Sequence, residues 1–389
     1  MPSVDPADDL VEKACAYVTS HAKAMESLLR SMVETSSWTR DVHGVNAVGT
    51  LLRESVPLEC EVVSGGAHGD HCVFHAGRPA SDGGVILLGH MDTVFPRETF
   101  AGYRSDGERA YGPGVLDMKG GLVVVVFALR ALERVGALRN MALSFVAVSD
   151  EEVGSPDSTP TVRRVARGAK VSLDFESGRP GDALVTRRKG TGSFTVTARG
   201  RAAHAGNHHA TGANAIWALA RYIDGAQRLT DYAEEVTVNI GTVRGGIGKN
   251  TVPAEAVAEG DLRYVNAAQR DAIGEGLVGL CASSAVEGTR LEFQWGPGRP
   301  PLERTEASGA LRDQYEACQR AVGLGGGELA IVGGGSDAAT TGAMGIPSID
   351  GLGPRGDGYH TVNEYIELPT LALKCLALVR YLAAHHATT

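Results

Sequence analysis

The chain has 389 residues, of which 43% are hydrophobic and 21% are charged, as expected for a globular protein too long for one ordinary compact core. Its formal net charge of -9 argues against a nucleic-acid partner, because binding to a phosphate backbone requires a basic face. No window approaches the roughly 18 to 20 apolar residues of a membrane span, and the acidic N-terminus lacks an apolar signal core, so we expect a cytoplasmic protein that acts on small molecules or short peptides.

The first part of the chain alternates between helical and strand patterns. Apolar residues recur at helical spacing over 9–34, which predicts an amphipathic helix at the start. Short apolar runs at 85–88 and 143–148 predict buried strands, and a long apolar helix is expected between them at 121–135. Such continuous apolar strands are typical of a largely parallel sheet in an α/β domain. Polar residues directly after these strands are candidate ligand-binding residues, because open α/β sheets bind ligands beyond the carboxyl ends of their strands.

Near residue 189 the pattern changes to an alternation of apolar and polar residues. The order strand, helix, strand, strand, helix, strand follows, which matches a ferredoxin-like unit. These elements are predicted at 193–199, 212–229, 235–243, 254–264, 267–284 and 290–296. The Gly- and Pro-rich stretch 296–301 predicts a hinge, and the α/β style then returns, with an apolar helix at 368–383. We therefore predict a mixed, mostly parallel α/β domain formed by 1–187 and 300–389, with a ferredoxin-like (α+β) domain inserted at 188–299.

Five polar clusters follow predicted strands or occupy glycine-rich turns of the α/β domain. Each has an ordinary interpretation by itself, since a lone aspartate before a helix is most often an N-cap. The run 150–152 is less ordinary, because three adjacent carboxylates after a buried strand repel one another unless a cation or solvent compensates them. The clusters contribute His90 and Asp92, Asp117, Asp150 to Glu152, Asp174 and Glu176, and His360.

Together these clusters favour a metal site. Nitrogen and oxygen ligands without cysteine suit zinc in a catalytic setting, and a bridging aspartate is a common way to hold two ions roughly 3.5 to 4 Å apart. Cobalt and manganese stay alternatives, because such ligand sets rank metals only loosely. The six cysteines lie far apart without CxxC spacing, so neither a thiolate zinc site nor a disulfide framework is expected.

The spacing of these clusters along the chain resembles the two-zinc metallopeptidase family of glutamate carboxypeptidase (carboxypeptidase G), aminoacylase, acetylornithine deacetylase and succinyl-diaminopimelate desuccinylase. The likeness covers nearly the whole chain. The matching segments are 89–94, 112–121, 149–155, 175–176, 201–206, 333–338 and 358–360.

The resemblance implies a ligand set for two zinc ions per subunit. Asp117 matches the ligand that bridges the two ions. His90 and Glu176 would complete one zinc site, and Glu152 and His360 would complete the other. The family also implies a cis peptide bond after Asp117.

The resemblance also implies roles for residues that do not bind metal. Glu151 matches a general base that takes a proton from a metal-bridging water and returns it to the leaving amine, while Asp92 would orient His90. The inserted domain resembles the family's lid and dimerisation domain, which implies a homodimer. His204 matches a histidine that reaches the neighbouring subunit's site and helps stabilise the oxyanion.

Four further residues are implied to bind substrate: Asn250, Arg263, Gly335 and Ser336. Asn250 and Arg263 match positions that hold a substrate carboxylate. Without the motif context, a strand-edge salt bridge would be the preferred interpretation of the arginine, and a surface residue that of His204.

The leading interpretation is a metal-dependent amide hydrolase that releases a C-terminal amino acid from an N-acyl or peptide substrate with a free carboxylate. Glutamate is one candidate for that amino acid, in view of the acid at Glu176. The alternatives are an N-deacylase, an N-carbamoyl hydrolase, an amide-forming biosynthetic homologue and a catalytically silent binding protein. The catalytically silent binding protein is disfavoured, because a protein without activity has no chemical reason to keep Glu151. The segments 177–180 and 187–189 fit no branch of the family, so side-chain specificity stays open.

Overall fold

The computed structural model describes residues 6–386 and divides them into two compact units. Unit 1 comprises the described residues up to 187 together with 304–331 and 336–386, and unit 2 comprises 188–303 and 332–335. Each unit has a hydrophobic core of its own. Residues 300–303 and 332–335 thus belong to unit 2, whereas the sequence pattern assigns them to the α/β domain.

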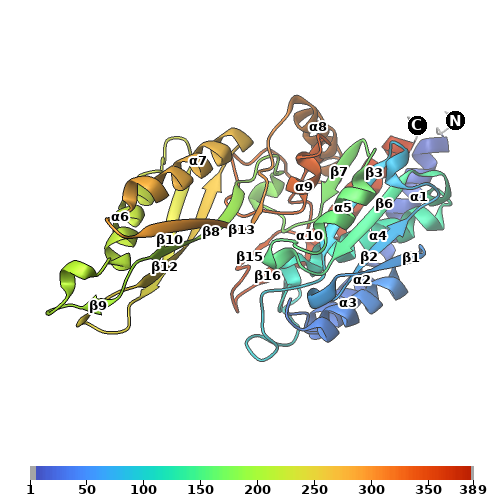
Figure 1. The fold of residues 1–389 in the computed structure, drawn as a ribbon. Coiled ribbons are helices and arrows are strands. Elements are labelled where there is room, and N and C mark those ends of the chain that lie inside the picture. Colours follow the sequence, from blue (N-terminus) through green and yellow to red (C-terminus); the bar gives the residue numbers. More distant parts are fainter. Residues whose placement is uncertain (1–5, 387–389) are drawn as a thin grey trace. The chain divides into compact units, whose positions relative to one another are not determined.

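A six-stranded sheet forms the centre of unit 1 (Figure 1). Its order is β1-β2-β6-β3-β7-β14, in which the last four strands are parallel and β1 and β2 form an antiparallel hairpin at one edge. The predicted mixed, mostly parallel α/β fold is therefore confirmed. The strands are β1 (Cys60–Ser64), β2 (Asp70–His75), β3 (Val85–His90), β6 (Leu143–Val148), β7 (Val171–Asp174) and β14 (Ser348–Ile349).

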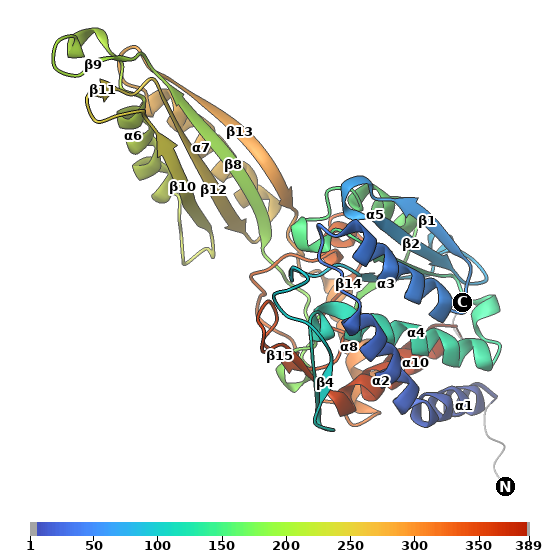
Figure 2. The same cartoon turned by 90° about the horizontal axis from the view of Figure 1, so that it is seen from below.

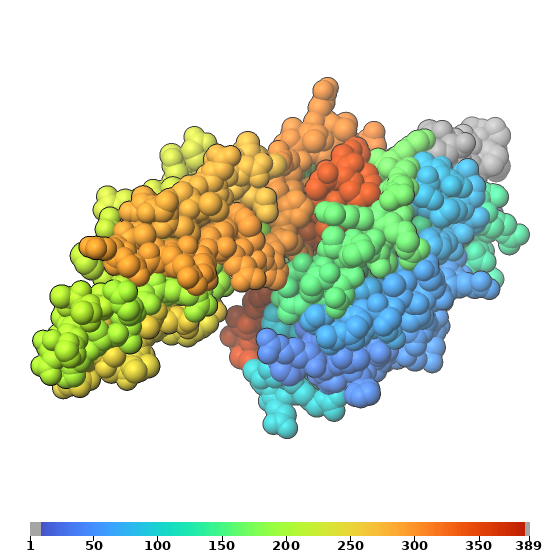
Figure 3. All heavy atoms as spheres, viewed as in Figure 1, coloured from blue at the N-terminus to red at the C-terminus, as the bar shows by residue number. Residues whose placement is uncertain are grey.

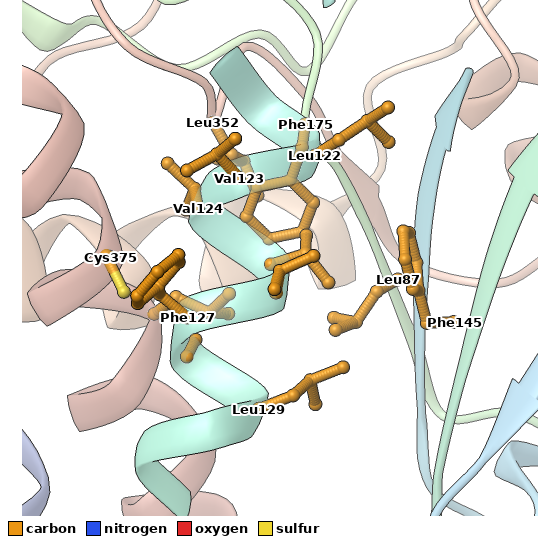
Figure 4. Packing of buried hydrophobic residues seen from close by; sticks show 14 of the residues in the cluster. Leu87, Leu122, Val123, Val124, Phe127, Leu129, Phe145, Phe175, Leu352 and Cys375 are labelled. Atoms are coloured by element: carbon orange, nitrogen blue, oxygen red, sulfur yellow. The ribbon is translucent and has the colours of Figure 1, made fainter. Parts of the chain in front are cut away.

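Helices cover both faces of this sheet. Helix α4 (Gly120–Arg134) is apolar almost all round, because it packs between the sheet and α10 (Leu368–His386). Figure 4 shows side chains of α4 directed toward Leu87 and Phe145 of the strands, with Phe127 beside Cys375 of α10 on the other side. Further helices of unit 1 are α3 (Val42–Ser55), α5 (Thr159–Ala166), α8 (Glu306–Arg320) and α9 (Ala338–Gly342).

Helix α5 lies on the opposite face of the sheet. Its residues Val162 and Val165 pack against Ile86 and Val146, which point away from the α4 side because successive side chains of a strand alternate. The polar side of α5 stays exposed and contributes to the green surface of unit 1 in Figure 3. The two sheet faces are thus both buried, which explains the continuous apolar strands in the sequence.

The N-terminal helical pattern forms two helices, α1 (Pro6–Ser20) and α2 (Ala22–Glu34), rather than one helix. The break lies at His21, whose φ of -109° departs from helical geometry and whose Nδ1 lies 2.8 Å from the carbonyl oxygen of Tyr17. A side chain that bonds to nearby backbone offers the chain an alternative to the helix. The apolar spacing continues across the break, so periodicity does not reveal it.

A small antiparallel sheet in unit 1 joins two turns that matter for the site. Its order is β15-β16-β5-β4, and β16 pairs with β5. The pairing holds the 358–364 loop next to the glycine-rich turn that follows β5. The strands are β4 (Arg104–Ser105), β5 (Arg109–Tyr111), β15 (Gly356–Asp357) and β16 (Tyr365–Glu367).

Unit 2 is a four-stranded antiparallel sheet with the order β10-β12-β8-β13. Figure 2 shows α6 and α7 lying along it, and Phe194, Val196 and Leu277 belong to the core between sheet and helices. The chain order β-α-β-β-α-β is the one predicted. The elements are β8 (Gly190–Arg199), α6 (Ala215–Gln227), β10 (Thr237–Gly245), β12 (Glu255–Tyr264), α7 (Ala267–Ser284) and β13 (Arg290–Arg299), with the short pair β9 (Ala203–His204) and β11 (Thr251–Val252) beside them.

The hinge predicted at 296–301 is wrong for residues 296–299. Strand β13 continues through Arg299 and pairs with β8, with a bulge between Trp295 and Gly298. Pro297 is tolerated there because β13 is an edge strand and the residue lies in the bulge, where no ladder hydrogen bond is lost. In the part of the chain that the structure describes, no helix combines the length and apolarity needed to cross a membrane.

Candidate metal centre

The candidate ligands lie where neighbouring parallel strands end. His90 is the last residue of β3, Glu151 and Glu152 follow β6, and Glu176 follows β7. Because β6, β3 and β7 are adjacent and parallel, their carboxyl ends meet at one edge of the sheet. The structure therefore brings these four side chains together.

Asp117 lies between two pairs of candidate ligands. Its Oδ1 is 3.1 Å from Nε2 of His90, which is itself 3.6 Å from Oε1 of Glu176. Its Oδ2 is 3.3 Å from Nε2 of His360, which is 3.2 Å from Oε2 of Glu152. Each carboxylate oxygen of Asp117 thus faces one imidazole and carboxylate pair.

The electrostatics of this cluster are those of crowded, buried carboxylates next to two imidazoles. Burial, and then the charge of Asp117, raise the pKa of Glu152 to about 8. Hydrogen bonds to Asp117 and Glu152 raise the pKa of His360 to about 10. Burial opposes the protonation of His90, but its contacts with Asp117 and Asp92 hold its pKa well above the usual value. Protons on the two imidazoles therefore supply the positive charge that the carboxylates require.

Divalent cations fit this donor set. Glu152 Oε1 is buried and has no hydrogen-bond partner, which is the state expected of an oxygen placed for a ligand outside the chain. Ligand atoms of His90, Asp117 and Glu152, and of His90, Glu151 and Glu176, lie within 4.8 Å of one another. Imidazole nitrogen and carboxylate oxygen are the ligands that catalytic zinc uses.

Asp92 connects His90 to the loop that carries the two glutamates. It is fully buried, and His90 Nδ1 is 2.9 Å from its backbone oxygen and 3.4 Å from its Oδ1. Its carboxylate accepts the backbone N–H groups of Glu151 and Glu152, both at 3.2 Å. The hydroxyl of Thr39 also donates to it, at 2.7 Å. Thr39 carries no signal in the sequence, because it lies far from every motif.

Glu364 is a second residue that sequence reasoning missed. Its side chain is fully buried and accepts the backbone N–H groups of Gly114, Leu116 and Asp117 at 3.2, 2.8 and 3.0 Å. These bonds hold the turn in which the Asp117–Met118 peptide bond is cis, as the resemblance implies. A glutamate four residues after His360 has no local pattern that would mark it as the acceptor for a turn near residue 115.

Four of the predicted site residues belong to unit 2, and three of them lie within 188–303. His204 is exposed on β9, and its Nδ1 accepts the N–H groups of Gly206 and Asn207 at 3.1 and 3.0 Å. Asn250 lies next to it, because β11 begins at the following residue and pairs with β9. Arg263 is paired with Asp261 at 3.0 Å near the far end of β12.

The structure therefore brings His204 and Asn250 together within unit 2 but not Arg263. Strand β12 starts at Glu255, close to β11, and places Arg263 eight positions further along, roughly 25 Å away at the usual rise of a strand. Within one chain, Asn250 and Arg263 are therefore too far apart to bind the same carboxylate group. The expectation that both hold one substrate carboxylate would need residues from two chains.

The remaining two predicted residues lie in the glycine-rich loop 333–338. Gly335 belongs to unit 2, where its carbonyl oxygen accepts from Arg188 Nη1 at 3.3 Å. Ser336 belongs to unit 1 and is fully buried, with its hydroxyl donating to Asp350 at 2.8 Å. This placement gives a structural role to the Ser336 side chain and no support for a direct contact with substrate.

A third group of potential ligands, His68, Asp150 and Asp157, also belongs to unit 1. His68 Nδ1 is 2.7 Å from Asp157 Oδ2, and the Asp150 carboxylate accepts the N–H groups of Asp157 and Ser158. A hydrogen bond between His68 and Asp157, next to an N–H-bonded aspartate, accounts for these contacts.

An α/β unit in which one aspartate faces two imidazole and carboxylate pairs defines a metal-dependent hydrolase with room for two ions. Comparison with known proteins then gives the family. Residues 86–384 match peptidase family M20/M25/M40, and the chain belongs to this family.

Curated relatives include enzymes with two different names. Carboxypeptidase G2 from Pseudomonas sp. (strain RS-16) is 28% identical over 367 residues, covering 91% of this chain and 87% of that protein. Succinyl-diaminopimelate desuccinylase from Bordetella petrii is 26% identical over 368 residues, covering 90% of this chain and 94% of that protein. The chain is thus a hydrolase of this metallopeptidase family, and the identities do not single out one substrate.

Solved structures support the fold. A tripeptidase from Staphylococcus aureus subsp. aureus Mu50 matches with a TM-score of 0.76 at 20% identity, covering 93% of this chain and 99% of that chain. A dinuclear metal-binding peptidase of the M20 family from Bacillus subtilis matches with a TM-score of 0.71 at 16% identity, covering 95% of this chain and 99% of that chain.

Proposed function

We propose that this protein hydrolyses the amide bond of an N-acyl amino acid or short peptide and releases a C-terminal amino acid that carries a free carboxylate. The observation that carries the proposal is the geometry of Asp117, whose two oxygens face His90 with Glu176 and His360 with Glu152. These five residues would hold two divalent ions, zinc in the first instance and cobalt or manganese as alternatives. When bound, such ions polarise the scissile carbonyl group and make water a stronger nucleophile.

The residues around the ligands have distinct roles. Asp92 accepts the Nδ1 proton of His90, which would leave the Nε2 lone pair available to a metal ion held beside Asp117. Glu151 would accept a proton from the attacking water and deliver it to the leaving amine. One observation supports Glu151 over Glu152 as the base: Glu152 is deeply enclosed and already contacts His360.

The test of this mechanism uses Glu151→Gln with Glu152→Gln as its matched control. Metal content is measured on reloaded protein, and amine release is followed on a panel of N-acyl amino acids and dipeptides. We expect Glu151→Gln to keep both ions and to lose roughly 10² to 10⁴-fold in turnover, because the amide cannot take the proton. Glu152→Gln should lose metal instead. Near-normal turnover of Glu151→Gln would refute its role as the base.

N-deacylation is the second candidate, favoured by the similarity to succinyl-diaminopimelate desuccinylase. The two candidates use the same residues and differ in the acyl group that is removed. Varying the acyl chain at a constant amino acid separates them, since a deacylase prefers simple acyl groups over peptidyl groups. Inactivity of wild-type protein on the whole panel would favour an amide-forming or silent homologue.

We further propose that the protein works as a homodimer in which His204 acts at the partner subunit's metal centre. Because His204 Nδ1 accepts two backbone N–H groups, its Nε2 carries the proton and is a donor for an oxyanion. The separation of Asn250 from Arg263 along unit 2 supports a site that combines residues of two chains. A self-complementary twofold contact is the commonest way to achieve this.

Mixing inactive variants tests the exchange of His204 between subunits. Alone, His204→Ala should lose roughly 10² to 10³-fold in turnover with unchanged metal content. Combined with Glu151→Gln subunits, it should regain activity, because one site of each heterodimer then has both Glu151 and a partner's His204. Absence of recovery despite demonstrated subunit exchange would place His204 outside the partner's site.

A further inference from the structure

Arg179 lies in the loop that follows Glu176, and it pairs with none of the acidic side chains within residues 6–386. Arg179 is half-buried, and its Nε is inaccessible to solvent and has no hydrogen-bond partner. Among residues 6–386 its guanidinium forms no ion pair, and Asp182, the next acid along the chain, is held by Arg355 and Lys374 instead. A partly buried cation is costly to desolvate unless an anion compensates it. The part of the chain that the structure describes supplies none, so we expect the anion from a bound ligand.

The position of Arg179 points to the metal centre as the place where that anion binds. Its guanidinium carbon lies 5.8 Å from the centroid of the Tyr359 ring. That ring meets the imidazole of His360 nearly at right angles, at a centroid distance of 5.9 Å. Arg179 and the candidate ligand His360 therefore flank the same aromatic side chain. All three residues belong to unit 1, so this placement is independent of unit 2.

We propose that Arg179 forms a carboxylate-binding subsite at the edge of the metal centre and helps to determine substrate specificity. The proposal rests on the proposed amide hydrolysis. The planar guanidinium presents two parallel N–H donors to a carboxylate, and its position over the Tyr359 ring restricts its movement. The carboxylate is either one at the end of a dicarboxylic acyl group or the α-carboxylate of the amino acid that is released.

The kinetic test compares wild type, Arg179→Gln and Arg179→Lys on matched substrates. Each N-succinyl amino acid is paired with its N-butanoyl analogue, which lacks the second carboxylate of the acyl group, and each free acid is paired with its carboxamide. Loss of a charge-assisted bidentate contact should raise KM roughly 10- to 100-fold, with kcat much less affected. A rise confined to N-succinyl substrates identifies the acyl carboxylate, and a rise confined to free acids identifies the α-carboxylate. Arg179→Lys should recover part of the loss.

Arg134→Gln is the matched control, because it removes the same charge from an exposed position in the last turn of α4. It should leave every KM unchanged. The subsite is overturned if Arg179→Gln leaves all KM values unchanged. It is also overturned if the loss falls equally on substrates with and without each carboxylate, which is the result expected of a purely structural contact with Tyr359.

A calorimetric titration keeps this inference separate from the proposed activity. Succinate and butyrate are titrated into metal-loaded wild type and Arg179→Gln, and no turnover is required. If the subsite exists, Arg179→Gln should weaken the binding of succinate by roughly tenfold or more relative to the binding of butyrate. If wild type hydrolyses no substrate, the proposed function fails, but the difference between succinate and butyrate binding still tests the subsite. Equal effects of Arg179→Gln on the binding of the two acids would overturn the subsite.

Discussion

Replacing Glu364 should destabilise unit 1 in proportion to the number of backbone donors left without an acceptor. Burial raises the pKa of Glu364 to about 7, so the measurement is made at pH 8, where the group is ionised. Glu364→Gln keeps the Oε1 atom that accepts from Leu116 and Asp117 and loses the Oε2 bond from Gly114. Glu364→Ala loses all three bonds.

The expected losses of unfolding free energy follow from the number of hydrogen bonds that each substitution removes. A hydrogen bond to a charged group contributes about 1.5–3 kcal/mol, so Glu364→Gln should cost about 1–3 kcal/mol. Glu364→Ala should cost about 3–6 kcal/mol, less than a simple sum because bonds within one network are not independent. For a unit of this size each kcal/mol lowers Tm by roughly 2–4 °C.

Calorimetric unfolding of metal-free protein measures the two changes, and metal binding is then titrated on the same variants. Metal affinity should fall in the same order, because Glu364 fixes the turn that carries Asp117. The reasoning is refuted if Glu364→Ala is within about 0.5 kcal/mol of Glu364→Gln, since the three N–H groups would then have found other acceptors.

Three further predictions concern metal content, pH and packing. Reloaded wild type should hold two divalent ions per chain by elemental analysis and Asp117→Ala at most one, and undiminished binding would contradict a bridging role. Burial lowers the pKa of Lys374 to about 8 from 10.5, against the opposing effect of Asp182. The unfolded chain therefore binds the Lys374 proton more tightly than the folded chain between these pH values, so this lysine alone should add roughly 3 kcal/mol to stability from pH 8 to 10.5, whereas buried thiols and phenols act in the opposite direction. The contribution of the lysine is the difference between wild type and Lys374→Met in urea unfolding, and parallel curves for the two proteins would exclude it. At Gly121 a Cβ would lie 2.0 Å from the carbonyl oxygen of Phe175, whereas at Gly279 it meets nothing within 4 Å. Gly121→Ala should cost about 1–3 kcal/mol or more, and Gly279→Ala should add about 0.5–1 kcal/mol, so equal Tm values would argue against the close packing.

The sequence predicts those features of the site that depend on local pattern. His90, Glu152 and Glu176 each follow an apolar run, and the sheet order brings the ends of these runs together. Period-two alternation likewise predicts the strands of unit 2, and the α/β and ferredoxin-like fold classes could be read from such patterns.

Features that depend on contacts between distant segments could not be predicted. Glu364 accepts hydrogen bonds from a turn near residue 115, and Thr39 supports Asp92, yet neither has neighbours in sequence that reveal its partner. The unequal placement of Asn250 and Arg263 also follows only from the strand register. The sequence shows which residues are close to one another along the chain. It does not show that the direction of β12 places Arg263 far from Asn250 in space.

The order of the ligands along the chain has a consequence for biosynthesis. His360, which faces Asp117 and Glu152, is made after the whole of unit 2, and Glu176 is made before it. At about 5–20 residues per second, a ribosome needs roughly ten to forty seconds to advance from Glu176 to His360. During this interval the nascent chain exposes an incomplete acidic cluster, while the inserted unit has time to fold. The metal centre can therefore be completed only near the end of translation, and a chain that stops before His360 would display four of the five candidate ligands without the fifth.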